Sequence, residues 1–413
     1  MKFLTAVLVA LCLAFSWYYA HCIDARFGVG LKPGQVNDYF QLWNASRAIL
    51  RQADPYGPEV TLQNQIAVYG TTAKALGMKI DRRLIYPIQA TFPLLPLGWL
   101  EFHVADKIAL CLMATLVALS IGWLRGAWDR TTILYVFLAF SSYPVIVALQ
   151  MRQPTLLFFG LILGSFALLR SRHLIWAGFL AALACSKPQI AFPVLVPMMV
   201  WALAKWHERK RFLIALAASE LAFLSLGGIL SPGWISEWLS ALRDYPTYVH
   251  SSVAVFLFGN RGGLFVSGIL FIGLAAVLWR HHDHDLSFLA AVSAAVFMVV
   301  IQREIYNLVI LVVPAVWVAD HAQQIRASGP ANQLVLAIVR VAFLEFWLAA
   351  ALGGVLMNTT PLGQSIAWWF STNMAVPVLW SLVAMMVLQV FSSPPTAVRK
   401  EEAIASASSL AGK

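Results

Sequence analysis

An acidic residue beside an aromatic cluster begins the stretch of this 413-residue chain that could do chemistry. The stretch runs from Asn37 to Tyr56, NDYFQLWNASRAILRQADPY, and Asp38 stands at its front. A carboxylate held next to a substrate hydroxyl can act as a general base. Asn37 or Asp38 stands at the N-cap position of a helix, and for Asp38 the Gln41 three residues later resembles a capping box. Both roles stay open, because a capping carboxylate keeps a second oxygen free.

Basic residues in apolar surroundings form a second set of candidates. Lys187 lies inside the run Ala-Cys-Ser-Lys-Pro, where a charge is costly and usually faces a cavity or a partner. Pro188 would break a helix there and free backbone groups to line a site. The alternative is a lysine at a helix end whose ammonium group reaches the water interface. Similar polar clusters are Arg152-Gln153-Pro154 and Gln302-Arg303-Glu304, where the alternative is a simple Arg303–Glu304 pair.

Composition assigns the chain to the polytopic membrane proteins. It is 60% hydrophobic and 12% charged, with a mean hydropathy of +0.74, whereas soluble domains carry roughly 25% charged residues. Spans of about 20 residues leave space for about twelve transmembrane helices. The net charge of +10 then reflects basic cytoplasmic loops and not nucleic-acid binding. The four cysteines show no paired spacing, so neither a disulfide framework nor a zinc site is expected.

The predicted organisation is a first span over 3–20, a long outer loop over 21–103 and a series of further spans. The loop carries amphipathic helices at 37–56 and near 63–76. A proline-rich piece at 86–100 follows, which is expected to be re-entrant or interfacial and not a full span. Six spans then lead to a second outer loop at 231–262. We predict a catalytic transmembrane module over 1–262, C-terminal transmembrane helices over 263–390 and a disordered cytoplasmic tail over 391–413. The spans are expected near 104–124, 131–149, 154–169, 174–187, 188–204, 212–230, 263–280, 286–301, 304–320, 341–357 and 366–390.

Charge distribution predicts the orientation of these spans. Basic connectors at 125–130, 170–173 and 205–211 alternate with nearly uncharged ones, which makes them cytoplasmic. Both termini are then cytoplasmic, and Asp38 lies on the outer side. The short outer connectors hold five cations, namely Arg152, Lys187, Arg243, Arg261 and Arg303. The run His281-His282-Asp283-His284-Asp285 offers metal-ligand types, but it falls in a cytoplasmic connector, so we favour a solvated loop over a metal site.

Two classes of function fit these observations. No GxSxG, P-loop, HExxH or strand-linked GxGxxG motif is present, which argues against a serine hydrolase, an ATPase and a Rossmann enzyme. Ionisable residues that gather at the outer face favour a membrane enzyme. Glu220 and Glu345 lie within apolar runs and favour the rival reading, a multi-pass transporter or lipid-linked sugar flippase. A third reading is a structural partner in envelope assembly.

Four motifs in order resemble glycosyltransferase family 87, within the GT-C superfamily. They are Asp38-Tyr39 through Asp54-Pro55-Tyr56, Tyr86-Pro87 with the apolar run 92–97, Gln153 with its apolar run, and Gly178 through Lys187-Pro188. The resemblance implies an all-α, GT-C-like fold in the cell (plasma) membrane. It also implies an α-mannosyltransferase that takes its sugar from a polyprenyl-phosphate donor. The acceptor would be a glycan or glycolipid, with no cofactor, no metal and no nucleic acid.

The resemblance also implies roles for particular residues. Asp38 would be the catalytic base. Lys187 would match the basic residue near the donor phosphate, and Gln153 a polar position that faces the site. Apart from the resemblance, the other outer cations Arg303, Arg261 and Arg152 are further candidates to bind the phosphate, and Tyr39, Trp43, Tyr306 and Asn307 are candidates to line the site. The chain departs from the family pattern where Arg152 replaces a glycine and where Ile88 replaces a second proline. Arg303, Tyr306 and Asn307 stand where a histidine is often found, and the outer aromatic residues could equally be interface anchors.

Overall fold

Every regular element that the structure describes is a helix. The computed structural model describes residues 2–27, 36–78, 81–244, 252–282, 285–301, 304–327 and 329–356. Within these ranges there is no β-strand, which confirms the all-α class. The predicted span 366–390 and tail 391–413 lie outside the described residues.

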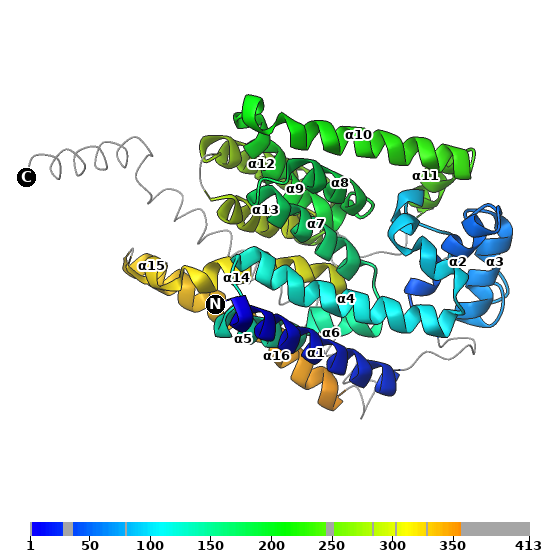
Figure 1. The fold of residues 1–413 in the computed structure, drawn as a ribbon, viewed down its shortest axis with the longest axis horizontal. Helices are drawn as coiled ribbons and strands as arrows, with labels where there is room; N and C mark the ends of the chain where they lie inside the picture. Colours follow the sequence, from blue (N-terminus) through cyan, green and yellow to red (C-terminus); the bar gives the residue numbers. More distant parts are fainter. Residues whose placement is uncertain are drawn as a thin grey trace, which may run out of the picture.

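The helices follow the chain in an order close to the predicted one (Figure 1). The first half contains α1 (Lys2–Phe27), α2 (Tyr39–Leu50), α3 (Pro58–Tyr69), the 3-10 helix η1 (Ile88–Trp99), α4 (Phe102–Arg125), α5 (Arg130–Phe140), α6 (Tyr143–Gln150), α7 (Thr155–Arg170), α8 (Leu174–Ala184) and α9 (Pro188–Ala204). The second half contains α10 (Trp206–Leu230), α11 (Trp234–Asp244), α12 (Val253–Arg280), α13 (Leu286–Val300), the 3-10 helix η3 (Ile305–Leu311), α14 (Val312–Asp320), α15 (Ala322–Ala327) and α16 (Pro330–Leu356).

Fewer helices than expected are long enough to cross a membrane. Among the described residues, four pass by length and composition, in α1, α4, α10 and α12. The pair α5 and α6, bent by 63° at its break, would make a fifth span. The prediction of about twelve spans is therefore not confirmed. Its other segments fold largely as apolar helices of 11–17 residues, such as α7, α8, α9 and α13, whereas a straight span needs about 20.

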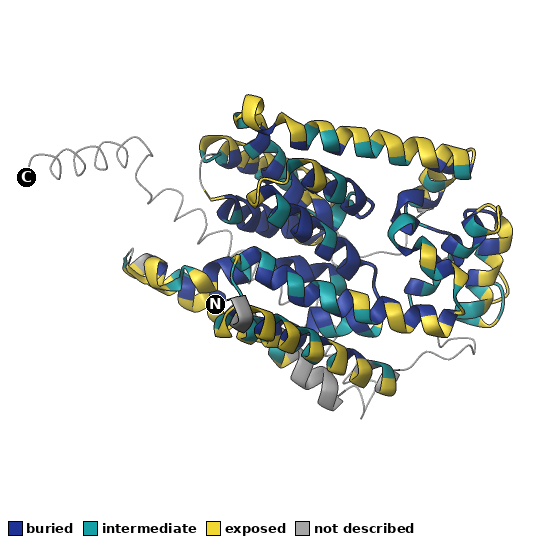
Figure 2. Ribbon diagram, viewed as in Figure 1, coloured by how far each residue is buried: buried dark blue, intermediate teal, exposed yellow. Residues whose placement is uncertain are grey.

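A buried layer of helices forms the centre of the molecule. Figure 2 shows α7 and α13 almost wholly buried, whereas α10 and α1 expose much of their surface on opposite sides. Exposed apolar side chains such as Leu221 and Ile229 on α10 suit contact with lipid. Close packing of α8 on α10 depends on Gly178, where a Cβ atom would lie 2.6 Å from the carbonyl oxygen of Phe212. Small residues at such contacts let membrane helices approach closely.

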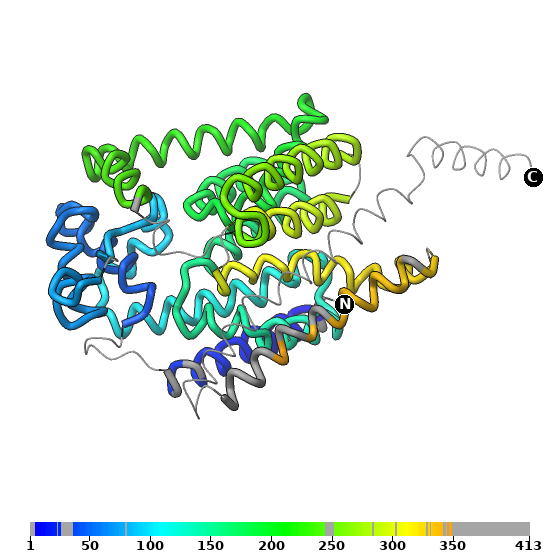
Figure 3. Tube along the Cα trace, turned by 180° about the vertical axis from the view of Figure 1, so that it is seen from behind, coloured from blue at the N-terminus to red at the C-terminus, as the bar shows by residue number. Residues whose placement is uncertain are grey.

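The predicted outer loop folds as a separate group of helices at one end of the molecule. Figures 1 and 3 show α2 and α3 there, beyond the start of α4. The predicted helix within 37–56 is confirmed as α2, and the turn after it forms where the amide of Tyr56 donates to Asp54 Oδ1 at 3.0 Å. The piece at 86–100 is η1, in which Pro93 and Pro96 exclude regular α-helical bonding. Together these elements hold Asp38 beside the connector between α6 and α7.

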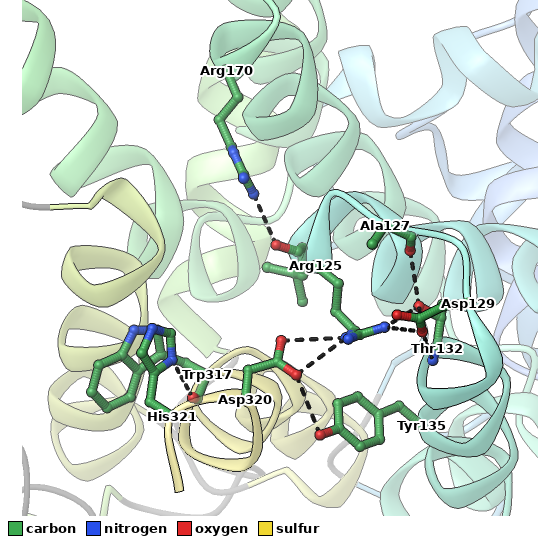
Figure 4. Close-up of polar contacts among 10 residues, drawn as sticks. Arg125, Ala127, Asp129, Thr132, Tyr135, Arg170, Trp317, Asp320 and His321 are labelled. Atoms are coloured by element: carbon green, nitrogen blue, oxygen red, sulfur yellow. Dashed lines mark hydrogen bonds and ion pairs between the residues drawn. The ribbon is translucent and has the colours of Figure 1, made fainter. Parts of the chain in front are cut away.

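An ionic cluster ties several helices together at the other end of α4. Arg125 binds Asp129 at 2.5 Å and Asp320 at 3.2 Å (Figure 4). Arg170, at the end of α7, donates to the carbonyl oxygen of Leu124 at 2.9 Å. The cluster therefore joins α4, α5, α7 and α14 at the end away from Asp38.

Candidate active site

Asp38 directly precedes α2 and keeps its carboxylate clear of the helix end. Its backbone is helical, with φ −69° and ψ −18°, and its side chain makes no capping hydrogen bond. The capping acceptor is Asn37 instead, whose Oδ1 receives the N–H of Tyr39 at 3.1 Å. The expectation that Asp38 also caps the helix is therefore wrong, because the neighbouring amide already does so. The Asp38 carboxylate is left for other contacts.

Gln153 and Arg82 are the polar partners of the Asp38 carboxylate. The side-chain amide of Gln153 donates to Asp38 Oδ2, and Arg82 Nη1 lies 3.9 Å from Asp38 Oδ1. The Asp38 side chain is 30% exposed. Asp38 Oδ1 faces the Arg82 guanidinium group and accepts no hydrogen bond within the described part of the chain.

Competing influences set the proton affinity of Asp38. Exclusion of water by the surrounding protein raises the pKa of its carboxyl group. The charges of Arg82 and Lys187 and the hydrogen bond from Gln153 lower this pKa, and the charge of Glu304 raises it further. The pKa of Asp38 stays above its ordinary value, and a carboxyl group with a raised pKa in a cluster of polar groups is a candidate for acid–base chemistry.

Lys187 points into the protein and not toward the water interface. It links α8 to α9 and is 6% exposed. Its ammonium group donates to Thr155 Oγ1 at 2.5 Å. The same group lies 5.6 Å from the ring centroid of Tyr86 and 4.8 Å from that of Tyr306, so two aromatic faces stabilise the cation. The alternative of a lysine that extends to the interface is therefore wrong.

The connector before α7 joins the carboxylate to the ammonium group. Gln153 contacts Asp38, and Thr155, two residues later, contacts Lys187. Asn307 Oδ1 on η3 lies 3.5 Å from Thr155 Oγ1. The structure therefore brings together five of the predicted site residues from four separate parts of the chain, namely Asp38, Gln153, Lys187, Tyr306 and Asn307.

Three of the other predicted site residues occupy different surroundings. Arg152 is fully buried between two carboxylates, so it is not open to a phosphate. Tyr39 stacks on Phe102 with no exposed surface, and Trp43 donates to the carbonyl oxygen of Leu100. The rings of Tyr39 and Trp43 pack against Phe102 and are buried in the core beside α2. They do not lie on an exposed surface, where the prediction placed them as part of the acceptor side.

Arg261 and Arg303 are the two remaining predicted phosphate ligands. Arg261 is exposed on α12, and no contact between described residues joins it to Asp38 or Lys187. Arg303 lies outside the described residues.

Three site residues escape sequence reasoning: Arg82, Tyr86 and Thr155. Tyr86 and Thr155 carry a weak signal, because one begins the Tyr-Pro motif and the other directly follows Gln153-Pro154. Arg82 carries no signal, since its contact to Asp38 spans a loop of irregular backbone in which its own φ angle is +59°. The cluster thus combines one carboxylate, one buried cation and several polar groups around them. No group of three or more metal-ligating side chains occurs in the described ranges.

Comparison with known proteins identifies the family of the chain. A family model described as Glycosyltransferase family 87 matches residues 84–302. No curated protein and no solved structure matches the chain. The matched range includes Tyr86, Gln153 and Lys187, whereas Asp38 precedes it and Tyr306 follows it. Because the match covers more than half of the 413 residues, the chain belongs to glycosyltransferase family 87.

Proposed function

We propose that this membrane glycosyltransferase moves a hexose, mannose by family resemblance, from a polyprenyl-phosphate donor to a hydroxyl group of a glycan or glycolipid acceptor. The reaction takes place at the outer face of the membrane and inverts the anomeric centre. The observation that carries the proposal is the short connector of Gln153 and Thr155, which joins a partly exposed carboxylate to a buried ammonium group. Such a pair supplies a proton acceptor and a site for a phosphate anion.

The mechanism is a single displacement. Asp38 takes the proton of the acceptor hydroxyl as its oxygen bonds to the anomeric carbon of the sugar. The bond from that carbon to the lipid phosphate breaks, and its electron pair leaves with the phosphate oxygen. Positive charge develops on the sugar ring in the transition state, as in glycoside hydrolysis. The ammonium group of Lys187 stabilises the negative charge that grows on the departing phosphate.

An apolar cavity that begins on η3, directly after two of the site residues, supports a lipid-linked donor. It has a volume of about 500 Å³ and is lined by α5, α6, η3, α14 and α16. Its lining includes Leu308 and Val309, which directly follow Tyr306 and Asn307 on η3. It reaches Ala319 near the end of α14. We assign this cavity to the first isoprene units of the donor, because an apolar chain leaving the phosphate would meet it beside the site.

A donor panel tests the proposed reaction. The purified protein in lipid nanodiscs is given radiolabelled polyprenyl-phosphate mannose, polyprenyl-phosphate arabinose or GDP-mannose, together with a lipid extract as acceptor. We expect label in the acceptor from the polyprenyl-phosphate mannose alone. Transfer from arabinose would correct the sugar, and transfer from GDP-mannose would overturn the lipid-linked donor. Movement of the donor across a bilayer without transfer would favour a flippase.

Filling the cavity is expected to weaken donor binding. Ala315→Trp on α14 places a large ring in the cavity. We expect KM for a long-chain donor to rise about tenfold, as expected from the loss of roughly two buried methylene groups at about 0.8 kcal/mol each. The KM of a short-chain, water-soluble donor analogue should not change. Ala218→Trp, at an exposed position of α10, is the matched control. An equal effect on both donors would exclude this cavity as the lipid site.

A further inference from the structure

Arg152 combines two unfavourable features at one residue. Its φ angle is +47°, in the left-handed region where residues with a side chain are strained. Its side chain has no exposed surface, although burial of an unpartnered charge is strongly unfavourable. A residue with these features persists only where surrounding contacts compensate for them.

The compensating contacts come from two carboxylates on different helices. Arg152 Nη2 lies 3.2 Å from Oδ1 of Asp24 on α1, and Arg152 Nε lies 3.4 Å from Oδ2 of Asp106 on α4. Asp106 is 2% exposed. Arg152 Nη1 also donates to the carbonyl oxygen of Gln150 at 3.2 Å. The Asp24–Arg152–Asp106 triad therefore fixes the connector before α7 to both helices.

The triad reaches Asp38 through the residue before it. Asp106 Oδ1 accepts a hydrogen bond from Asn37 Nδ2 at 2.6 Å. Asn37 in turn caps α2 through the N–H of Tyr39 at 3.1 Å. The backbone on the N-terminal side of the base is thus held by Asp106, whose charge is balanced by Arg152.

The triad also reaches Asp38 from the other side. Gln153 directly follows Arg152 and donates to the Asp38 carboxylate. The backbone N–H of Asp38 donates to the carbonyl oxygen of Met151, directly before Arg152, at 3.1 Å. Arg152 therefore lies between the two groups that orient the base, and its backbone conformation sets where both of them point.

We propose that Arg152 is a positioning residue, which acts through Asp106 and Gln153 to hold the carboxylate of Asp38 against the acceptor hydroxyl. The inference rests on the proposed role of Asp38 as the base. A shift of about 1 Å in a reacting group can lower the rate on the order of 10²-fold. Loss of the triad should therefore reduce kcat, while donor binding at Lys187 is retained.

The direct test is Arg152→Gly. Glycine adopts the left-handed conformation without strain, so the change removes the guanidinium group and relieves the backbone. We expect kcat to fall on the order of 10²-fold, with the donor KM changed less than about twofold. Arg152→Lys keeps the positive charge but lacks the planar guanidinium fork that spans the two carboxylates, so it should give an intermediate kcat. The matched control is Arg172→Gly, an exposed arginine with a φ angle of +63°, which should leave kcat unchanged.

A pH–rate profile separates positioning from a merely structural role. The hydrogen bond from Gln153 lowers the pKa of Asp38, so its loss in Arg152→Gly should move the acid limb of the profile to higher pH. If Arg152→Gly does not fold, the same kcat and pH–rate measurements are made on Asp106→Asn in the full-length protein. This variant removes one charge of the triad, and its side-chain oxygen can still accept the hydrogen bond from Asn37.

Parallel assays of Asp38→Asn distinguish failure of this inference from failure of the proposed function. A folded Arg152 or Asp106 variant with the wild-type kcat and acid limb, beside an inactive Asp38→Asn, overturns the positioning role alone. An active Asp38→Asn overturns the base assignment and the positioning role together.

Discussion

Replacement of Asp38 by asparagine is expected to lower kcat for sugar transfer by about 10²–10⁴-fold, the usual contribution of a general base. Asparagine has a similar shape but cannot take up the proton of the acceptor hydroxyl. Its side-chain oxygen can still accept the hydrogen bond from Gln153, and the capping of α2 by Asn37 is untouched. The measurement is single-turnover transfer from a polyprenyl-phosphate donor by the purified variant in lipid.

Folding and pH dependence supply the controls for this variant. Because burial raises the pKa of Asp38, its ionised form opposes folding above its ordinary pKa of about 3.9. The Tm of Asp38→Asn at neutral pH should therefore equal or exceed that of the parent protein. Wild-type activity should fall as the pH drops through the raised pKa, and the residual activity of the variant should lack this limb. Asp129→Asn alters a helix-start aspartate that does cap its helix, and it should stay active. Normal transfer by Asp38→Asn would exclude Asp38 as the base.

Lys187→Met is expected to lower kcat/KM for the donor by about 10²–10³-fold, as for loss of one preorganised group that stabilises developing charge. Methionine fills a similar volume between the rings of Tyr86 and Tyr306 but carries no charge. Among the described side-chain contacts of Thr155, Lys187 supplies the positive charge and Asn307 is neutral. The departing phosphate would therefore face an uncharged pocket.

Separate KM values for the two substrates test the assignment of Lys187. The donor KM should rise, and the acceptor KM should stay unchanged. Folding should be retained, because an apolar side chain replaces a buried charge. Lys210→Met, at an exposed position of α10, is the control and should have wild-type kinetics. An equal rise in both KM values, or a loss of folding without a kinetic change, would give Lys187 a structural role only.

The part of the site that sequence reasoning predicts is the part with strong chemical signals. A carboxylate at a helix start, a lysine within an apolar run and a glutamine before a proline stand out in any membrane chain. The structure brings these residues, Asp38, Lys187 and Gln153, into one cluster. Tyr306 and Asn307 are candidates because they stand where the family pattern often has a histidine. The helical class follows from composition alone.

The rest depends on contacts between distant parts of the chain. Arg152 is 128 residues from Asp24 in sequence, so its burial in the triad is invisible to local patterns and its charge alone suggested a phosphate ligand. Helix breaks are a second difficulty. A hydropathy window reads α5 and α6 as one span, but the turn at Ser141 and Ser142 bends the pair by 63°. A hydropathy window therefore reports apolar length and not whether the helix is straight.

The ionic clusters at the two ends of α4 are separated by about the thickness of a bilayer. Asp106 and Arg125 are nineteen residues apart on that helix, which corresponds to about 29 Å at 1.5 Å per residue. This length matches the hydrocarbon thickness of a typical bilayer, about 30 Å. In the proposed topology, the rigid helix α4 and not the loop before α2 therefore sets the height of Asp38 above the lipid tails. Bilayer thickness becomes a variable of the reaction, since a thicker membrane would draw the carboxylate toward the lipid and away from a water-borne acceptor.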